Sequence, residues 1–246
     1  NPALEGSPNP LLDLESFHTE CVFADLEIVE KRLDRARKER ADAHEIATFE
    51  LAQANLEEER PLRLIPDADL DRSLIKGYGI LSDRPLLVVV NRDEEHAADP
   101  LAGKLDTRIK ELGAAGLTLC ASIEADIAGM EPADQEEFLA DLGLKESALS
   151  RFIRSAYDLL DLISFFTVGE DEVRAWTIRR GTNAHRAAGK IHSDLERGFI
   201  RAEVTPCEVF MDYGSEAAVK DAGKLQVEGK NYLVSDGDIM HVRFNV

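Results

Sequence analysis

Two short polar segments each follow an apolar run of the kind that forms a buried strand. The segment Asn91–Glu94 follows the run 85–90, whose lack of alternation is typical of a strand buried on both faces. The segment Cys120–Glu124 closes a second run, predicted to be a strand over 117–122, and a helix is predicted between them over 101–112. Strand, helix and strand imply a parallel pair, and ligands of such sheets bind beyond the carboxyl ends of the strands. The two segments are therefore predicted to line one ligand site.

A second candidate site is a basic stretch near the C-terminus. Five basic side chains and no acidic one lie between Val173 and Ser193, namely Arg174, Arg179, Arg180, Arg186 and Lys190. The net charge of the chain is −19, but from residue 160 on there are 11 Lys and Arg against 14 Asp and Glu. The acidic excess therefore lies mainly in the first part, and a local basic face can still contact the phosphates of RNA. The alternative is that these side chains only face solvent from a sheet and a helix.

Other side chains with chemical potential have simpler explanations. No typical zinc-ligand spacing relates the candidate ligands, which are His185, His192, Cys207 and His241. Core packing explains Cys120 better than a nucleophilic thiol does. Trp176 is consistent with stacking on a base and also with a place in the core or at the edge of a sheet. No metal ligand and no catalytic residue is predicted in this chain.

The basic stretch lies within a predicted hairpin, helix and strand. Apolar residues over 162–168, a turn, and alternation over 173–178 predict a β-hairpin. The apolar stripe of the next helix consists of Ala184, Ala188, Ile191 and Leu195. Gly198 is expected to end this helix in the left-handed conformation, and a strand follows over 200–204. This order predicts the beginning of a β-grasp module, whose remaining strands are expected over 225–227, 232–234 and 239–245.

The first part of the chain is predicted to form two antiparallel helices. From Asp13 a heptad-like seam runs along the first helix through Val22, Leu26, Val29, Leu33 and Ala36. The second helix carries Ile46, Phe49 and Leu56 and stops before Pro61. Two such helices with a short link make a coiled-coil hairpin. Its charge-dense run over 30–40 is consistent with a solvated helix face or with nucleic-acid contact.

Four shorter helical segments complete the prediction. A short helix is expected over 67–75, and another begins at Pro132 and closes at Gly143. An amphipathic helix over 149–160 leads into the β-grasp part, and one helical turn is expected over 206–211.

The segment Phe165–Val204 resembles the TGS domain that closes the YchF / Obg-like ATPase family of P-loop NTPases. The resemblance continues through 228–232 and 234–239 to 244–246, and it covers about eighty residues with few departures. One departure is His185, which stands where the family commonly has proline at the start of the helix. This change alters a helix cap and leaves the predicted fold intact.

The same resemblance gives the two polar segments a role. Asn91–Glu94 resembles the fourth guanine-nucleotide motif in the NxxE form of YchF-like proteins, and Cys120–Glu124 resembles the fifth. Moving the base-reading carboxylate one methylene further, to Glu94, weakens the grip on guanine and fits adenine. Asp93 complicates this assignment, because it offers a shorter carboxylate one position earlier. The predicted nucleotide-binding set is Asn91, Arg92, Glu94, Cys120, Ala121 and Ser122, with Asn91 bracing the loops and Arg92 stacking on the purine.

No stretch fits GxxxxGK[ST], the loop that holds the β- and γ-phosphates. By resemblance, the chain is expected to be the latter two thirds of a longer protein, inactive alone and without tightly bound nucleotide. The expected fold is α/β, a partial P-loop NTPase sheet with an inserted helical hairpin, followed by an α+β TGS domain. The expected parts are the end of the first G-domain segment over 1–12, a coiled-coil insertion over 13–80, the second G-domain segment over 81–160, and the TGS domain over 161–246.

Two functions remain open from the sequence. The first is part of a YchF-like protein that binds and hydrolyses ATP, or GTP, with Mg²⁺ in the intact protein and associates with the ribosome or RNA. The alternative is a non-enzymatic adaptor that docks on the ribosome or RNA. The three cysteines, Cys21, Cys120 and Cys207, are far apart in the sequence and odd in number, which argues for reduced thiols. A cytoplasmic protein is therefore expected, because thiols stay reduced in that compartment. No apolar run is long enough to span a membrane, and no sequence-specific DNA binding is expected.

Overall fold

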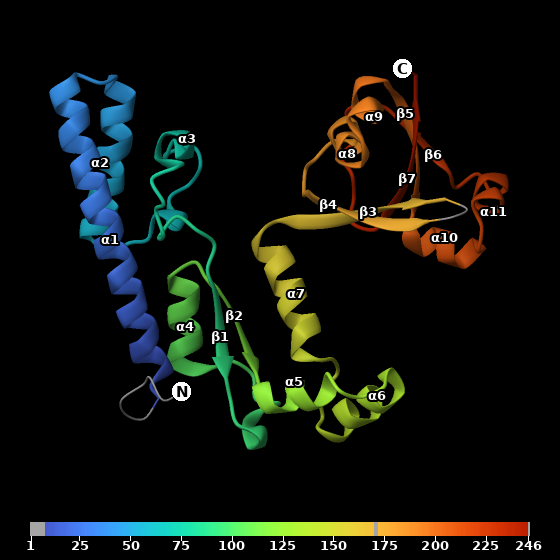
Figure 1. Cartoon of the computed structure of the whole chain (residues 1–246), viewed down its shortest axis with the longest axis horizontal. Coiled ribbons are helices and arrows are strands. Elements are labelled where there is room, and N and C mark those ends of the chain that lie inside the picture. Colours follow the sequence, from blue (N-terminus) through green and yellow to red (C-terminus); the bar gives the residue numbers. More distant parts are fainter. Residues whose placement is uncertain (1–7, 170–171, 246) are drawn as a thin grey trace. The chain divides into compact units, whose positions relative to one another are not determined.

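The computed structural model describes residues 8–169 and 172–245. The chain divides into two compact units, Asn1–Ala156 and Tyr157–Val246 (Figure 1). The largest hydrophobic clusters lie in different units, one around the first two helices and one around the sheet of the second unit. Within the described residues, no helix is both long and apolar enough to cross a lipid bilayer.

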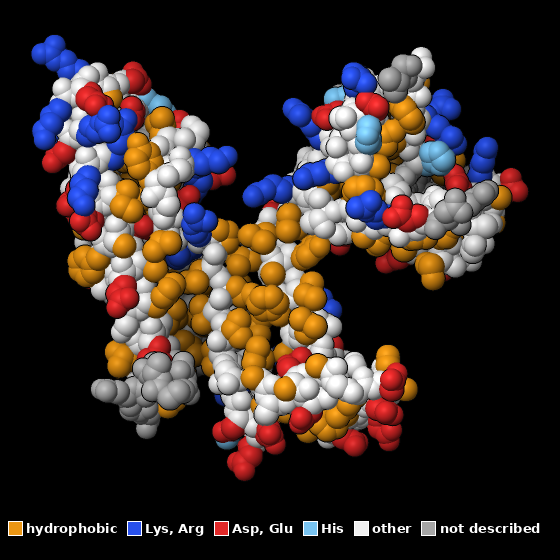
Figure 2. Space-filling view, viewed as in Figure 1, with side chains coloured by type: hydrophobic (Ala, Val, Ile, Leu, Met, Phe, Trp, Pro, Cys, Tyr) orange, Lys and Arg blue, Asp and Glu red, His pale blue; other side chains and the backbone are white. Residues whose placement is uncertain are grey.

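The first unit begins with two long helices packed side by side, as the heptad-like seam predicts (Figure 1). Helix α1 (Pro10–Glu39) begins at Asn9, whose Oδ1 accepts a hydrogen bond of 3.2 Å from the N–H of Leu12. Helix α2 (Ala43–Glu57) begins at Asp42, whose side chain accepts from His44. The seam is buried against the second helix through Val29, Leu33, Ala36, Phe49 and Leu56. The outer surfaces of both helices carry mixed acidic and basic side chains, as Figure 2 shows.

A two-stranded parallel sheet follows in the first unit. The 3₁₀ turn η1 (Leu62–Leu64) and the short helix α3 (Arg72–Ile75) lead into β1 (Leu87–Asn91). Next come the 3₁₀ turn η2 (Glu94–His96), helix α4 (Gly103–Glu111) and β2 (Ala115–Leu119). Strands β1 and β2 are parallel, with Leu87 opposite Ala115 and Asn91 opposite Leu119, so the strand–helix–strand prediction is confirmed.

Two details of this sheet differ from the prediction. The second strand ends at Leu119, because helix α5 (Ala121–Ile127) begins directly after Cys120 and buries Ile123 and Ile127 one turn apart. The expectation that the first strand is buried on both faces is also wrong, since the side chain of Val89 is 41% exposed. Among the described residues the sheet has only these two strands, which leaves part of β1 uncovered.

Two helices close the first unit. Helix α6 (Pro132–Asp141) begins at proline and closes before Gly143, as predicted, and Gly143 has the left-handed conformation. Helix α7 (Ala148–Leu159) has the predicted amphipathic sequence, and its last residues belong to the second unit. Three of its apolar residues are partly exposed, Leu149 at 62%, Phe152 at 41% and Ile153 at 49%, whereas Ala148 is buried.

The second unit contains a five-stranded mixed sheet in the order β4-β3-β7-β5-β6. The strands are β3 (Leu162–Val168), β4 (Val173–Arg179), β5 (Phe199–Pro206), β6 (Gln226–Glu228) and β7 (Asp238–Phe244). Strands β3 and β4 form the predicted antiparallel hairpin, whose turn residues 170 and 171 lie outside the described residues. Strand β7 lies between β3, to which it is parallel, and β5, to which it is antiparallel.

The helix predicted over 184–195 is two helices. Helix α8 (Ala184–Ile191) stops at His192, whose backbone is extended, and α9 (Ser193–Arg197) follows. The Nδ1 atom of His192 accepts a hydrogen bond of 3.1 Å from the N–H of Asp194, so this side chain caps the second helix. Both helices nevertheless contribute to the core, through Ala184, Ala187, Ala188 and Leu195.

The expected conformation of Gly198 is wrong. Its φ of −90° is not left-handed, so backbone freedom does not explain the glycine. A Cβ atom at this position would overlap the backbone carbonyl of Asn245. The N–H of Asn245 donates a hydrogen bond of 2.9 Å to the carbonyl of Gly198, so the close approach joins the end of α9 to the residue that follows β7.

The segment after β5 is more helical than predicted. Helices α10 (Cys207–Tyr213) and α11 (Glu216–Asp221) replace the single expected turn. The strand expected over 232–234 is reduced to one isolated bridge between Asn183 and Leu233. Tyr232 instead donates its hydroxyl to the buried carboxylate of Asp238 at 2.8 Å, which ties this segment to β7.

Candidate functional site

The two polar segments meet at the carboxyl ends of β1 and β2. The backbone N–H of Ala121 donates a hydrogen bond of 3.0 Å to Oδ1 of Asn91. The N–H of Arg92 donates to the carbonyl of Leu119 at 2.8 Å. These contacts place the segments 91–94 and 120–124 side by side, as the parallel strands predict. Their part in binding a base stays a prediction.

Glu94 and Ser122 form the second link between the segments. The hydroxyl of Ser122 donates a hydrogen bond of 3.0 Å to Oε1 of Glu94. The Sγ atom of Cys120 lies 3.1 Å from the same hydroxyl oxygen, and Cys120 itself is 4% exposed. The buried thiol and the serine therefore hold the carboxylate of Glu94 at the end of β2.

Asp93 is engaged elsewhere. Its Oδ1 accepts a hydrogen bond of 3.1 Å from the N–H of His96 and lies 2.5 Å from Nδ1 of the same residue. The hydrogen bond to His96 lowers the pKa of Asp93, and the hydrogen bond to Asp93 raises the pKa of His96. Asp93 thus caps the turn η2, while the carboxylate of Glu94 turns to the other segment. The sequence assigns the base-reading role to Glu94, with Asp93 as a complication, and this role stays a prediction.

The side chain of Arg92 lies against the loop that follows η2. Its Nη2 donates to the carbonyl of Pro100 at 3.4 Å. Its Nε atom is buried and has no hydrogen-bond partner among the described residues. The stacking of Arg92 on a purine stays a prediction.

Sequence reasoning missed the role of Glu124. Its carboxylate accepts hydrogen bonds from the N–H groups of Ala148, at 2.7 Å, and of Leu149, at 3.2 Å. These are free donors at the start of α7, so Glu124 caps that helix from a distant part of the chain. No local pattern signals such a cap, because the partners are more than twenty positions apart in sequence. The cap joins the Cys120 segment to α7.

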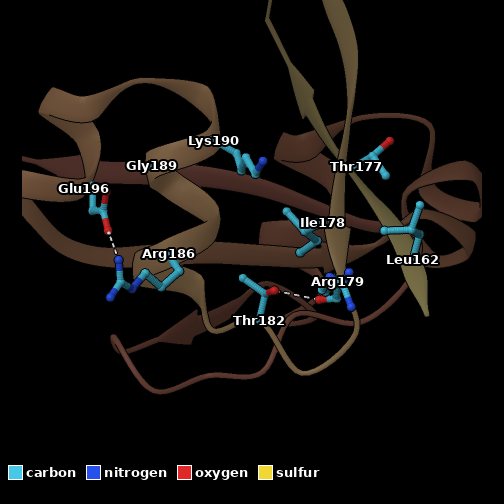
Figure 3. Close-up of a pocket in the computed structure, with 9 residues that line it drawn as sticks. All are labelled: Leu162, Thr177, Ile178, Arg179, Thr182, Arg186, Gly189, Lys190 and Glu196. Atoms are coloured by element: carbon cyan, nitrogen blue, oxygen red, sulfur yellow. Dashed lines mark hydrogen bonds and ion pairs between the residues drawn. The ribbon is translucent and has the colours of Figure 1, made fainter. Parts of the chain in front are cut away.

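The five basic residues of the second unit do not form one cluster. The guanidinium of Arg174 lies over the ring of Trp176, 4.3 Å from its centroid. Arg180 pairs with Asp161 at 3.2 Å. The other three, Arg179, Arg186 and Lys190, line one pocket of about 540 Å³ between β4 and α8. Figure 3 shows this pocket with its lining side chains.

Trp176 has a structural environment that accounts for its position. Its indole N–H donates to Oγ1 of Thr167 at 3.0 Å, and one face of its ring carries Arg174. It also packs against the core cluster of the second unit. Of the two interpretations of this residue, the place in the sheet is the one that the contacts favour.

No metal centre is assigned. In the part of the chain that the structure describes, no group of three or more His, Cys, Asp or Glu side chains could hold a metal ion. His192 caps α9 and His241 lies 4.0 Å from Glu216, so each of these two has a local partner.

The whole chain is similar to proteins of one family. It is 40% identical over 252 residues to the ribosome-binding ATPase YchF of Bacillus subtilis (strain 168), which covers 99% of this chain and 69% of the relative. The chain belongs to the YchF family. It is also 38% identical over 249 residues to the ribosome-binding ATPase YchF of Escherichia coli O157:H7, again with 99% and 69% covered.

The fold agrees with this membership of the YchF family. The structure of the Schizosaccharomyces pombe YchF GTPase superposes with a TM-score of 0.85 at 31% sequence identity, over 98% of this chain and 68% of that one. The family model YchF-GTPase_C, described as a protein of unknown function (DUF933), matches residues 162–245. This match covers most of the second unit. A mixed α/β fold of the YchF type is therefore established.

Proposed function

We propose that this chain is the base-recognising and ribosome-contacting part of a YchF-type ATPase. The observation that carries the proposal is the hydrogen bond between Asn91 and Ala121, which holds the two polar segments together at the ends of two parallel strands. Two relatives, each about two-thirds covered by this chain, are named ribosome-binding ATPases. The intact protein would bind ATP, or GTP, with Mg²⁺ and associate with the ribosome.

In this proposal the carboxylate of Glu94 reads the base. The hydroxyl of Ser122 donates to Oε1, and this bond orients the carboxylate so that Oε2 accepts a hydrogen bond from the base edge. Guanine presents two neighbouring donors that are best gripped by both oxygens of a carboxylate, whereas adenine presents one exocyclic amino group. The chemistry of the pair therefore favours adenine. Asn91 contributes by fixing the distance between the segments.

Magnesium is not assigned to side chains of this chain. The described residues offer no group of three metal-ligating side chains, and the sequence contains no phosphate-binding GxxxxGK[ST] loop. The residues present therefore fit the base of a nucleotide and not its metal. The part proposed for this chain is to bind and orient the base.

In this proposal, the segments of the chain correspond to the domains of the YchF family. Residues 13–80, which include most of α1 and all of α2, are assigned as the coiled-coil insertion, and residues 81–160 as the second part of the G domain. The second unit is assigned as the β-grasp TGS domain. Support for the last assignment comes from the sheet order and from the family match over 162–245.

The test of base recognition uses the intact protein that contains this chain. Glu94→Ala is compared with Glu95→Ala, which removes the same charge one residue later in the turn η2. We expect Glu94→Ala to weaken ATP binding about tenfold or more, as loss of a hydrogen bond to a charged group does. The control should bind as wild type in the same calorimetric titration. Equal affinities of the two variants would contradict the proposal.

A ribosome- or RNA-binding adaptor is the second candidate function. The basic pocket of the second unit favours it, because this pocket lies apart from the base-recognising segments in the sequence. Reversal of Arg179, Arg180 and Arg186 to Glu should reduce co-sedimentation with ribosomes and lower its salt dependence. If these variants lose ribosome binding while Glu94→Ala leaves ATP binding unchanged, the adaptor is the better account.

A further inference from the structure

The pocket in the second unit combines an apolar floor with a cationic rim. It opens between the end of β4 and helix α8, and its volume is about 540 Å³ (Figure 3). The half-buried Leu162 supplies apolar surface beside the buried Ile178. The hydroxyls of Thr177 and Thr182 line the pocket but already form hydrogen bonds, the first with the hydroxyl of Tyr157 and the second to the carbonyl of Arg179. The volume lies within the range of roughly 300 to 1,000 Å³ that is typical of sites for small ligands.

Basic side chains outnumber acidic ones at the rim of the pocket, and within the part of the chain that the structure describes most of the basic ones have no acidic partner. Arg179, Arg186 and Lys190 face one acid, Glu196, which lies 3.4 Å from the guanidinium of Arg186. Among the described residues, neither Arg179 nor Lys190 forms an ion pair through its side chain. The pocket therefore carries a net positive charge and two cations that are available to a ligand.

A glycine on α8 permits this arrangement. A Cβ atom on Gly189 would overlap the carboxylate of Glu196, so any other residue here would make that flexible side chain shift. The acid in turn holds Arg186 at the edge of the pocket. Arg179 and Lys190 take no part in the ion pair between Arg186 and Glu196.

We propose that this pocket holds one unstacked nucleotide of a single-stranded RNA segment. The base would lie on the apolar floor and its phosphates would contact Arg179 and Lys190. An apolar surface beside cations is the combination that binds single strands, because every base has an apolar face and every linkage a charge. A duplex keeps its bases stacked inside and offers only its phosphates to the same rim. The inference rests on the RNA contact proposed above and specifies its chemical form.

Two pairs of substitutions in the intact protein separate the pocket from the general basic face. Arg179→Ala with Lys190→Ala removes two cations of the pocket, and Arg174→Ala with Arg180→Ala removes two outside it. We expect the pocket pair to lower the affinity for a 12-nucleotide single-stranded RNA about tenfold or more. Its salt slope should fall by about 1.4, since each phosphate contact to a single strand contributes about 0.7. If the two variants lose equal affinity for the RNA and have equal melting temperatures, the proposal that the pocket binds the strand is wrong.

The nucleic acid is varied in the same binding assay. A matched oligonucleotide without bases should bind the wild type about fivefold or more weaker, because stacking of a base is lost. The two variant proteins should bind a duplex of the same length with equal affinity. Equal affinity for the normal and the abasic strand would contradict insertion of a base.

Two further outcomes assign the pocket to another ligand and overturn its binding to RNA. One is binding of a free nucleoside monophosphate as tight as that of the strand, with the same dependence on Arg179 and Lys190. The other is preference for an acidic peptide over the strand. A wild-type protein that binds no RNA at all would refute the RNA contact itself and not only its form.

Discussion

The N–H of Ala121 donates a hydrogen bond of 3.0 Å to the side-chain oxygen of Asn91, thirty positions earlier in the chain. This bond joins the end of one strand to the beginning of the helix after the next strand. The N–H groups at the start of a helix lack partners within the helix, and the amide oxygen of Asn91 accepts one of them. This contact gives a structural reason for asparagine at position 91. A second hydrogen bond, from the hydroxyl of Ser122 to Glu94, joins the same two segments.

Replacing Asn91 by alanine should therefore separate the segments. We expect Asn91→Ala to weaken ATP binding by the intact protein about fivefold to tenfold, with a loss of about 1 kcal/mol in the free energy of unfolding. Isothermal titration and urea unfolding measure the two effects. ATP affinity equal to that of the wild type would show that the bond has no part in binding.

Replacing Ser122 by alanine should change base preference more than affinity. In the wild type the hydroxyl of Ser122 donates to Oε1 of Glu94, and its removal frees this acceptor site for one of the two donors of guanine. We expect Ser122→Ala to raise the affinity for GTP relative to ATP about fivefold, which corresponds to about 1 kcal/mol. Ser193→Ala, in the other unit, is the matched control. A ratio unchanged from wild type in Ser122→Ala would remove the serine from base selection.

The pair of Asp93 and His96 predicts a dependence on pH. The raised pKa of His96 means that its stabilising effect is complete below about pH 6.5 and is lost as pH rises through the raised value. The lowered pKa of Asp93 means that its effect is complete above about pH 3.9 and is lost as pH falls through the lowered value. The turn η2 should therefore be most stable between roughly pH 4 and 6.5.

An NMR titration of the ring of His96 measures this directly. We expect a midpoint above about 6.5, and Asp93→Asn should bring the midpoint back toward that value. A midpoint at or below about 6.5 in the unaltered protein would mean that the pair does not form in solution.

Gly198 provides a test of the second unit. A Cβ atom at this position would overlap the carbonyl of Asn245, whereas at Gly229 it would meet no atom within 4 Å. Gly198→Ala should lower the free energy of unfolding by about 1 to 3 kcal/mol, as overpacking does. Gly229→Ala should leave it nearly unchanged, and chemical unfolding monitored at Trp176 compares the two. Equal stabilities would mean that the chain end moves aside without strain.

Strands and paired helices were predictable because their signals are local. Apolar runs define β1 and β3, and the seam through Val29 and Leu33 defines α1. The break at His192 was hidden, because Ile191 and Leu195 keep the helical spacing while the histidine side chain caps a second helix. Local patterns report spacing well and backbone breaks poorly.

The candidate site was predictable in outline only. Parallel strand ends bring together whatever follows them, so the proximity of Asn91 and Ala121 follows from the order of elements. The division of work between Asp93 and Glu94 does not, since it depends on which carboxylate the nearby His96 engages. The cap that Glu124 provides for α7 is also a long-range contact without a local signal.

The most direct test of base recognition by Glu94 removes the 6-amino group of the base and the carboxylate of Glu94, each alone and both together. The affinities of the intact protein for ATP and for purine riboside triphosphate, which lacks the 6-amino group, are measured with the wild type and with Glu94→Ala. We expect the wild type to prefer ATP about fivefold or more and the variant to bind both equally, because the variant has no carboxylate for the 6-amino group of ATP to contact. The same preference for ATP in both proteins would contradict base recognition by Glu94.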